Sequence, residues 1–208
     1  MSDLKDYLDQ LTNPDPAQRQ DAIDALGKSG DSKAVDALLA RLHDDSPDVR
    51  RAAILALRRI DDPRAYEPML MTLADIDNRV RRRTSAWVMS MGRDTRLIAP
   101  LVKILADSSN RIAVREFAAM ALGNIGDSAA VEPLLNALSD TSPEMRRRIV
   151  HSLSIIPDPR AVESLGALLN DDDIPTRKIA AKTLRKIGTQ EALNLLEKHG
   201  LLDDSKDT

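Results

Sequence analysis

Apolar residues recur along the chain at helical spacing and are separated by short polar turns. The clearest stripe lies in segment 47–60, where Val49, Ala53, Ala56, Leu57 and Ile60 stand at i, i+4, i+7, i+8 and i+11. Such spacing places all five side chains on one face of an α-helix. Ser46 before Pro47 is a favourable start for this helix, and Asp61 follows its last apolar position. The pattern predicts a helix that buries one face.

The same pattern returns at a nearly constant interval, which indicates an internal repeat. Aligned copies each contribute one arginine: Arg19, Arg50, Arg81, Arg115, Arg146 and Arg177. The intervals between them are 31 residues, except for one of 34 that contains an extra residue near Arg93 and two more in turn 107–110. A first helix with its own apolar stripe precedes each arginine-bearing helix, as in segment 131–138. A fixed period of this length is typical of stacked repeat proteins.

A single helical pair of about 31 residues cannot bury its own apolar stripe and must stack on its neighbours. The sequence therefore predicts an all-α fold, a right-handed α-solenoid of about six helical hairpins. We expect one solenoid over residues 1–202 and a flexible tail over 203–208. Segments 3–12 and 190–198 are expected to be the unpaired first and last helices.

Short segments before the first helices carry a resemblance to a known family. They read Asp62-Pro63-Arg64-Ala65, Ala130-Val131-Glu132-Pro133-Leu134 and Asp158-Pro159-Arg160-Ala161-Val162-Glu163. These segments resemble HEAT repeats, and above all the short HEAT-like repeats of the phycobilisome lyase group, over about residues 13–199. The resemblance implies an armadillo-type α-solenoid fold. It is weakly specific for function, because the family includes scaffolds, lyases and hydroxylases.

Composition excludes several classes of protein. The 208 residues include no cysteine, so disulfides, thiolate metal sites and cysteine nucleophiles are excluded. Aromatic residues make up only 2% of the chain, which favours packed helices over β-sheets. The chain lacks an apolar run of membrane-spanning length, and its polar start does not resemble a signal peptide. We therefore expect a cytoplasmic protein without membrane insertion.

No catalytic motif withstands inspection. The histidines His43, His151 and His199 lie in distant repeats without metal-ligand spacing. HEAT-like hydroxylases use His-Glu pairs at a di-iron site, whereas serine, glycine or aspartate follows each histidine here. Gly27-Lys28-Ser29 lacks the glycine that a phosphate-binding loop requires at position 22. The sequence predicts no catalytic residue, no metal and no cofactor, and favours a protein that is not an enzyme.

The repeated arginines have acidic partners six residues earlier, in the turn before the helix. These partners are Asp44, Asp75, Asp140 and Asp171. A carboxylate in that turn can accept backbone N–H groups together with the guanidinium of the same repeat. The arginines could serve as anion sites. The resemblance to HEAT repeats implies instead a structural ladder that joins the turns of adjacent repeats, and we prefer this interpretation.

The second helices concentrate positive charge. Segments 16–29, 47–60, 78–91, 112–125, 143–156 and 174–187 together carry a net charge of +14, whereas the rest of the chain carries −17 and the whole −3. Ladder arginines and cations near helix C-termini explain part of this excess. A further row of cations aligns along one face of the second helices. Together with the apolar residues Trp87 and Met89, these cations form the predicted partner-binding face: Arg51, Arg82, Trp87, Met89, Arg147, Lys178, Lys182 and Arg185. Trp87 replaces a small residue of other repeats, which is also compatible with a place in the core among flexible methionines.

Three functions fit these features. The preferred function is a protein–protein interaction scaffold that binds an acidic partner through this inner face. The alternative, implied by the family resemblance, is a subunit of a bilin lyase or isomerase that holds an open-chain tetrapyrrole. Nucleic-acid binding comes third, because the net charge is negative and no base-reading motif is present. The sequence gives no indication of the oligomeric state.

Overall fold

The computed structural model describes residues 4–139 and 142–202, which form thirteen α-helices and no β-strand. This confirms the prediction of an all-α fold made of helical hairpins. The first helices of the hairpins are α1 (Leu4–Gln10), α3 (Val35–Ala40), α5 (Tyr66–Met71), α7 (Ile98–Ala106), α9 (Val131–Asn136), α11 (Val162–Ala167) and α13 (Gln190–Lys198). The second helices are α2 (Pro16–Ser29), α4 (Pro47–Ile60), α6 (Asn78–Met91), α8 (Ile112–Ile125), α10 (Pro143–Ile155) and α12 (Ile174–Ile187).

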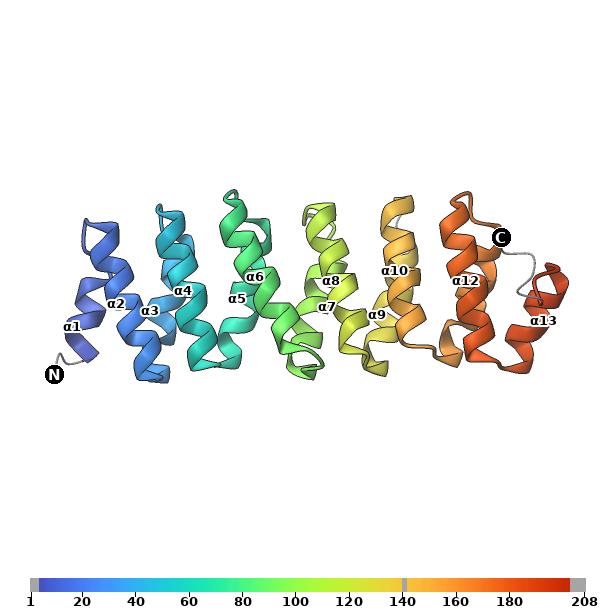
Figure 1. The fold of residues 1–208 in the computed structure, drawn as a ribbon, viewed down its shortest axis with the longest axis horizontal. Coiled ribbons are helices and arrows are strands. Elements are labelled where there is room, and N and C mark those ends of the chain that lie inside the picture. The colour runs from blue at the N-terminus through green and yellow to red at the C-terminus, as the bar shows by residue number, and fades with distance from the viewer. Residues whose placement is uncertain (1–3, 140–141, 203–208) are drawn as a thin grey trace. The chain divides into compact units, whose positions relative to one another are not determined.

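The chain divides into two compact units, Met1–Met91 and Gly92–Thr208. In the first unit the second helices α2, α4 and α6 run side by side, and in the second unit α8, α10 and α12 do the same (Figure 1). One continuous solenoid over residues 1–202 stays a prediction. The expected tail, 203–208, lies outside the described residues.

The second helices begin and end at the expected residues, except that α10 ends at Ile155, one residue before the expected end. Proline occupies the first turn of α4, where its missing N–H costs no hydrogen bond. At the C-terminus of α4 the backbone turns left-handed at Asp61, with φ of 55°, and α12 ends in the same way at Gly188. The αL residue lets the last backbone carbonyls find N–H partners, so the chain can turn sharply into the next hairpin.

Each of the first helices α3, α5, α7, α9 and α11 is entered through a short 3₁₀ turn capped by aspartate. The side-chain oxygen of this aspartate accepts the N–H two residues further on at 2.8–3.0 Å. The aspartates are Asp31, Asp62, Asp94, Asp127 and Asp158. A second 3₁₀ turn follows α3, α5, α9 and α11, whereas α7 remains α-helical to Ala106. The fourth repeat therefore departs from the others at its first helix.

Two pairs of neighbouring second helices approach each other through glycine. A Cβ atom at Gly27 in α2 would lie 2.7 Å from the Cα and Cβ atoms of Ala56 in α4. Gly123 in α8 meets Ser152 in α10 in the same way, and the Ser152 hydroxyl donates to the Ala119 carbonyl at 2.8 Å. Small residues at these positions set the closeness of the two helices.

Trp87 lies in the core and not on the partner-binding face. Only 1% of its surface is exposed, and its ring contacts that of Tyr66 with centroids 5.7 Å apart. The equivalent positions carry Ala56 and Ala121, so a wide ring fills space here that small residues fill elsewhere. The assignment of Trp87 to a docking surface is therefore wrong, and the alternative, a core residue, is correct.

Candidate functional site

The repeated arginines join adjacent repeats through their guanidinium groups. Arg50 donates from Nη1 to the backbone oxygen of Asp44 at 2.8 Å, and so binds the turn of its own repeat. Its Nε and Nη2 donate to the two carboxylate oxygens of Asp75, in the next repeat, at 2.7 and 2.8 Å. The expected pairing of each arginine with the carboxylate six residues earlier is thus corrected. That residue offers Arg50 its backbone carbonyl, because its carboxylate faces the preceding repeat.

Two other arginines of the described residues also bind a carboxylate of the next repeat. The pairs, all 25 residues apart, are Arg19–Asp44, Arg50–Asp75 and Arg146–Asp171. Burial opposes ionisation of Asp44, but the hydrogen bonds from Arg19 and from the Ser46 N–H outweigh it and lower the pKa of that carboxyl. The hydrogen bond from Arg146 likewise lowers the pKa of Asp171. These carboxylates are held in the charged form and connect neighbouring turns.

Three other ladder residues are held in their own ways. Arg81 donates from Nη1 to the Asp75 backbone oxygen at 2.7 Å, and Arg115 donates from Nε to that of Leu105 at 2.9 Å. Asp140, predicted as a ladder carboxylate, lies outside the described residues. Arg177 binds the turn of its own repeat through the backbone oxygens of residues 171 and 172.

A groove runs between α10 and α12 in the second unit. Two cavities of about 430 and 760 Å³ adjoin here, because His151 and Ile179 line both of them, and we call the two together the α10–α12 groove. Its remaining lining residues are Glu116, Glu144, Arg147, Arg148, Ser154, Ile155, Pro157, Lys182 and Lys186. The helical spacing of positions 147, 151 and 155 on α10, and of 179, 182 and 186 on α12, brings them to the facing sides of the two helices.

Cations outnumber carboxylates in this groove. Its walls carry four arginine or lysine side chains against Glu116 and Glu144. Arg148 and Lys182 form no ion pair with any described residue. Arg147 lies 3.8 Å from the Asp173 carboxylate, and Lys186 donates to the Ser154 backbone oxygen at 3.0 Å. Isoleucines at 155 and 179 add apolar surface. The groove can therefore hold carboxylates and an apolar side chain together.

The structure brings together only part of the predicted partner-binding face. Arg147 and Lys182 line the groove. Lys178 lines a separate cavity beside the N-terminal half of α12. Arg185 donates from Nη2 to the Leu201 backbone oxygen at 2.7 Å, so it holds the chain segment after α13.

The predicted residues of the first unit form a second group. Arg51 pairs with Asp48 on its own helix at 2.8 Å, which uses part of its charge locally. Arg82 is exposed, and Met89 has 49% of its surface exposed. Both therefore lie at the surface of α6, and their role in binding stays a prediction.

Sequence reasoning missed His151 as a groove residue, because it was considered only as a metal ligand. It also left Arg148 and Lys186 out of the predicted face. Counting i+4 neighbours from Arg147 and Lys182 would have found His151 and Lys186, and Arg148 lies three residues before His151 on the same helix.

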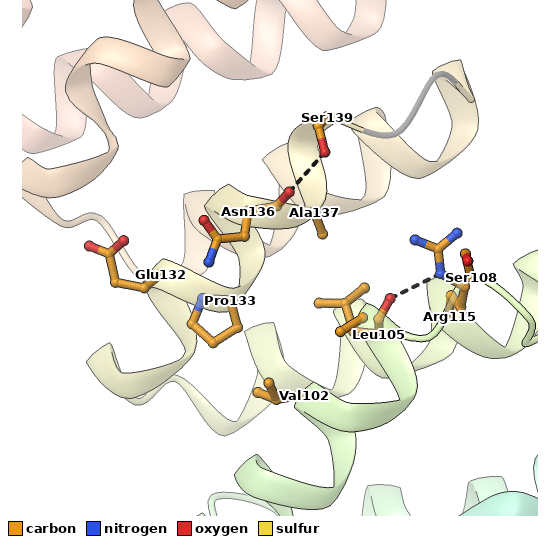
Figure 2. A pocket seen from close by; sticks show the side chains of 10 residues that line it. Val102, Leu105, Ser108, Arg115, Glu132, Pro133, Asn136, Ala137 and Ser139 are labelled. Carbon is orange, nitrogen blue, oxygen red and sulfur yellow. Dashed lines mark hydrogen bonds between the residues drawn. The ribbon is translucent and has the colours of Figure 1, made fainter.

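A second pocket, of about 440 Å³, lies between α7 and α9 in the second unit. Figure 2 shows Arg115 and Glu132 toward opposite ends, with Val102, Leu105 and Pro133 between them. The Arg115–Leu105 hydrogen bond fixes one end of this pocket. The pocket lies where the repeat period changes: the interval before Arg115 is 34 residues, whereas the other intervals are 31. This longer interval is the sequence signal that could have indicated it.

The described ranges contain neither a metal-binding cluster nor a membrane-spanning helix. Among residues 4–139 and 142–202, His, Asp and Glu side chains nowhere gather in a group of three that could hold a metal ion. None of the helices in these ranges has the length and apolar character needed to cross a bilayer.

Comparison with known proteins agrees with the repeat architecture. A family model described as HEAT repeats matches residues 4–90, 98–181 and 156–208. The phycocyanobilin lyase subunit alpha of Picosynechococcus sp. is 33% identical over 96 residues, which are 43% of this chain and 36% of that protein. The match thus spans about a third of the length of this curated relative.

Solved structures show the same fold. A designed armadillo repeat protein in complex with the peptide (KR)4 is 21% identical, with a TM-score of 0.52 over 89% of this chain and 100% of that one. Computationally designed armadillo repeat proteins for modular peptide recognition are 21% identical, with a TM-score of 0.50 over 88% of this chain and 99% of that one.

Proposed function

Because this chain belongs to the HEAT-repeat family, we propose that it is a non-enzymatic scaffold that binds an acidic segment of a partner protein. The observation that carries this proposal is the α10–α12 groove, where cations and isoleucines line two adjoining cavities. Carboxylates of the partner would approach Arg148 and Lys182, and an apolar side chain would lie against Ile155 and Ile179. Designed proteins of the same fold bind peptides, which supports a peptide-like ligand.

Electrostatics would contribute more to encounter and selectivity than to the final affinity. A cluster of cations in a concave surface raises the local potential and attracts acidic segments, an effect that salt weakens. Both glutamates line the smaller cavity beside Arg147 and Arg148, so a ligand should place more of its carboxylates toward Lys182 and Lys186 in the larger cavity than toward Arg148. A basic ligand would meet like charge in the groove and should bind poorly.

A fluorescent octapeptide of alternating glutamate and leucine, (EL)4, tests the proposal by fluorescence anisotropy. The variant Arg148→Glu/Lys182→Glu should weaken binding by about tenfold or more, and raising the salt to about 0.5 M should weaken wild-type binding as well. The variant Arg64→Glu/Arg160→Glu is the matched control, because it changes the net charge equally at exposed first-helix turns. The peptide (KR)4 serves as the ligand of opposite charge.

Equal losses in both double variants would contradict the groove, since net charge alone would then explain binding. Binding of (EL)4 that survives both high salt and the groove substitutions would contradict the electrostatic mechanism. Circular dichroism of each variant verifies that the helical fold is retained.

A second candidate function rests on the similarity to the phycocyanobilin lyase subunit. In this alternative the groove cations would bind the propionate groups of an open-chain tetrapyrrole, which the chain would hold for transfer by a partner. Mixing with phycocyanobilin would then change the visible absorption spectrum, and the Arg148→Glu/Lys182→Glu variant would reduce that change. An unchanged spectrum contradicts this alternative and leaves the scaffold proposal in place.

A further inference from the structure

The arginine ladder provides a template for recognising a carboxylate. In the rungs of Arg19 and Arg50, Nη1 of the arginine donates to backbone oxygens of its own turn, which fixes the plane of the guanidinium. The opposite edge, Nε with Nη2, then binds both oxygens of an aspartate 25 residues further on. This bidentate geometry suits a carboxylate and no neutral side chain.

Arg177 in α12 is oriented in the same way but lacks the second half of the rung. Its Nη1 donates to the backbone oxygens of Asp171 and Asp172 at 2.5 and 3.3 Å. The position 25 residues further on is Leu202, and none of the carboxylates in residues 4–139 and 142–202 forms an ion pair with Arg177. The edge that binds aspartate in other repeats therefore has no such partner within the described part of the chain.

A cavity of about 320 Å³ lies beside this guanidinium, lined in part by Asn170, Lys178 and His199. His199 donates from Nδ1 to the Leu195 backbone oxygen at 2.8 Å, because a carbonyl can only accept. Its Nε2 then accepts from the Asn170 amide at 3.3 Å. This hydrogen bond fixes one wall, while Lys178 adds a second positive charge and Leu169 and Ala181 add apolar surface.

We propose that Arg177 and this cavity form a carboxylate-binding site that receives an aspartate or glutamate side chain of a partner protein at the end of the stack. The site is separate from the α10–α12 groove and does not depend on the function proposed for it. In this site a carboxylate of another molecule would bind Arg177 as the aspartate of the next repeat binds the arginine in a complete rung.

The ligand is not the first turn of a second copy of this chain. The ladder position of that turn is Asn13, whose Oδ1 accepts the Asp15 N–H at 2.9 Å, as Asp44 accepts the Ser46 N–H. Its other end is an amide nitrogen, which donates to Gln10 at 3.1 Å and cannot accept from a guanidinium. Head-to-tail stacking would leave Arg177 without a carboxylate.

Nuclear magnetic resonance of arginine Nε–H groups in the ¹⁵N-labelled full chain tests the site. The probe is N-acetyl-aspartate N-methylamide, and the matched neutral probe is N-acetyl-asparagine N-methylamide. We expect a saturable shift of the Arg177 Nε–H signal with the aspartate probe only, while Arg50 and Arg146 remain unchanged. In Arg177→Gln the accompanying shifts of the His199 and Leu201 amides should disappear, whereas Lys33→Gln, which removes a cation of the first unit that does not line the cavity, should keep them.

A chain shortened to end at Leu202 distinguishes the source of the carboxylate. Equal titration of the full and shortened chains supports a site that awaits a partner. A response that appears only after shortening would mean that the chain's own acidic residues at 203–207 occupy the site, which overturns the partner assignment. Absence of a saturable shift in both chains, or self-association that requires Arg177, overturns the proposal as well.

Discussion

At the scale of single residues, the structure separates arginines that hold the fold from cations that are available at the surface. Arg50 forms four hydrogen bonds, two to backbone oxygens of its own turn and two to the Asp75 carboxylate, whereas its neighbour in sequence, Arg51, forms an ion pair with Asp48 on its own helix. Adjacent residues on a helix point about 100° apart, so they have different environments. Residue type alone does not distinguish these two roles.

Asp44 gives the first prediction. Asp44→Asn should lower the free energy of unfolding at neutral pH by about 1–3 kcal/mol, because Arg19 loses its charged acceptor. Asparagine fits the turn, since Asn13 occupies the equivalent place in the first repeat. The folded-state pKa of Asp44 lies below its ordinary value, so the stabilisation is complete above the unfolded pKa of about 3.9 and declines as the pH falls toward the folded pKa.

Urea unfolding at a series of pH values provides the measurement. The difference in stability between wild type and Asp44→Asn should be largest near neutral pH and should shrink as the pH falls below about 5. Asp36→Asn, at an exposed carboxylate, is the control with little effect. A difference that stays constant across this range would contradict the role assigned to the Asp44 charge.

At the scale of elements, small residues decide how closely neighbouring second helices pack. Gly27 against Ala56 and Gly123 against Ser152 are the two contacts where an added Cβ would meet backbone atoms. Elsewhere larger residues hold equivalent positions, and Trp87 with Tyr66 fills the wider space in the first unit. The spacing of each pair of helices thus follows from local residue size.

Gly27→Ala tests this packing directly. Alanine in an exposed helix would stabilise by about 1 kcal/mol, but here the new methyl group overlaps Ala56, so we expect a net destabilisation of about 1–3 kcal/mol. In the double variant Gly27→Ala/Ala56→Gly part of this loss should be recovered, which urea unfolding would measure as a favourable coupling energy. Stabilisation by Gly27→Ala alone would show that the two helices separate without cost.

At the scale of the whole molecule, charge is unevenly distributed between the kinds of helix and turn. The second-helix segments carry +14 in a chain with a net charge of −3, because acidic residues concentrate in turns and first helices. Aspartates of the ladder neutralise part of this positive charge. Another part belongs to the cations that line the α10–α12 groove, where a ligand can reach them. A surface of this kind produces a local field that differs in sign from the net charge.

This distribution predicts unusual behaviour on an ion exchanger. Despite its negative net charge, the protein should be retained on a sulfonate resin at pH 7 and low salt. Arg148→Glu/Lys182→Glu should elute at lower salt than Arg64→Glu/Arg160→Glu, although the two variants have the same net charge. Identical elution of the two variants would contradict a concentrated basic surface in the groove.

The sequence by itself determined the repeat, the all-α fold and the ends of most helices. These features depend on the helical spacing of apolar residues, on caps such as Asp61 and on the repeat of about 31 residues. A fixed repeat outweighs the secondary-structure preferences of single residues. Only the tertiary structure decided which repeat each ladder carboxylate joins, that Trp87 is buried, and that His151 and Lys186 line one groove with Lys182. The physical reason is that these outcomes depend on distances between helices about 31 residues apart in the chain, and side-chain size at their contacts sets those distances.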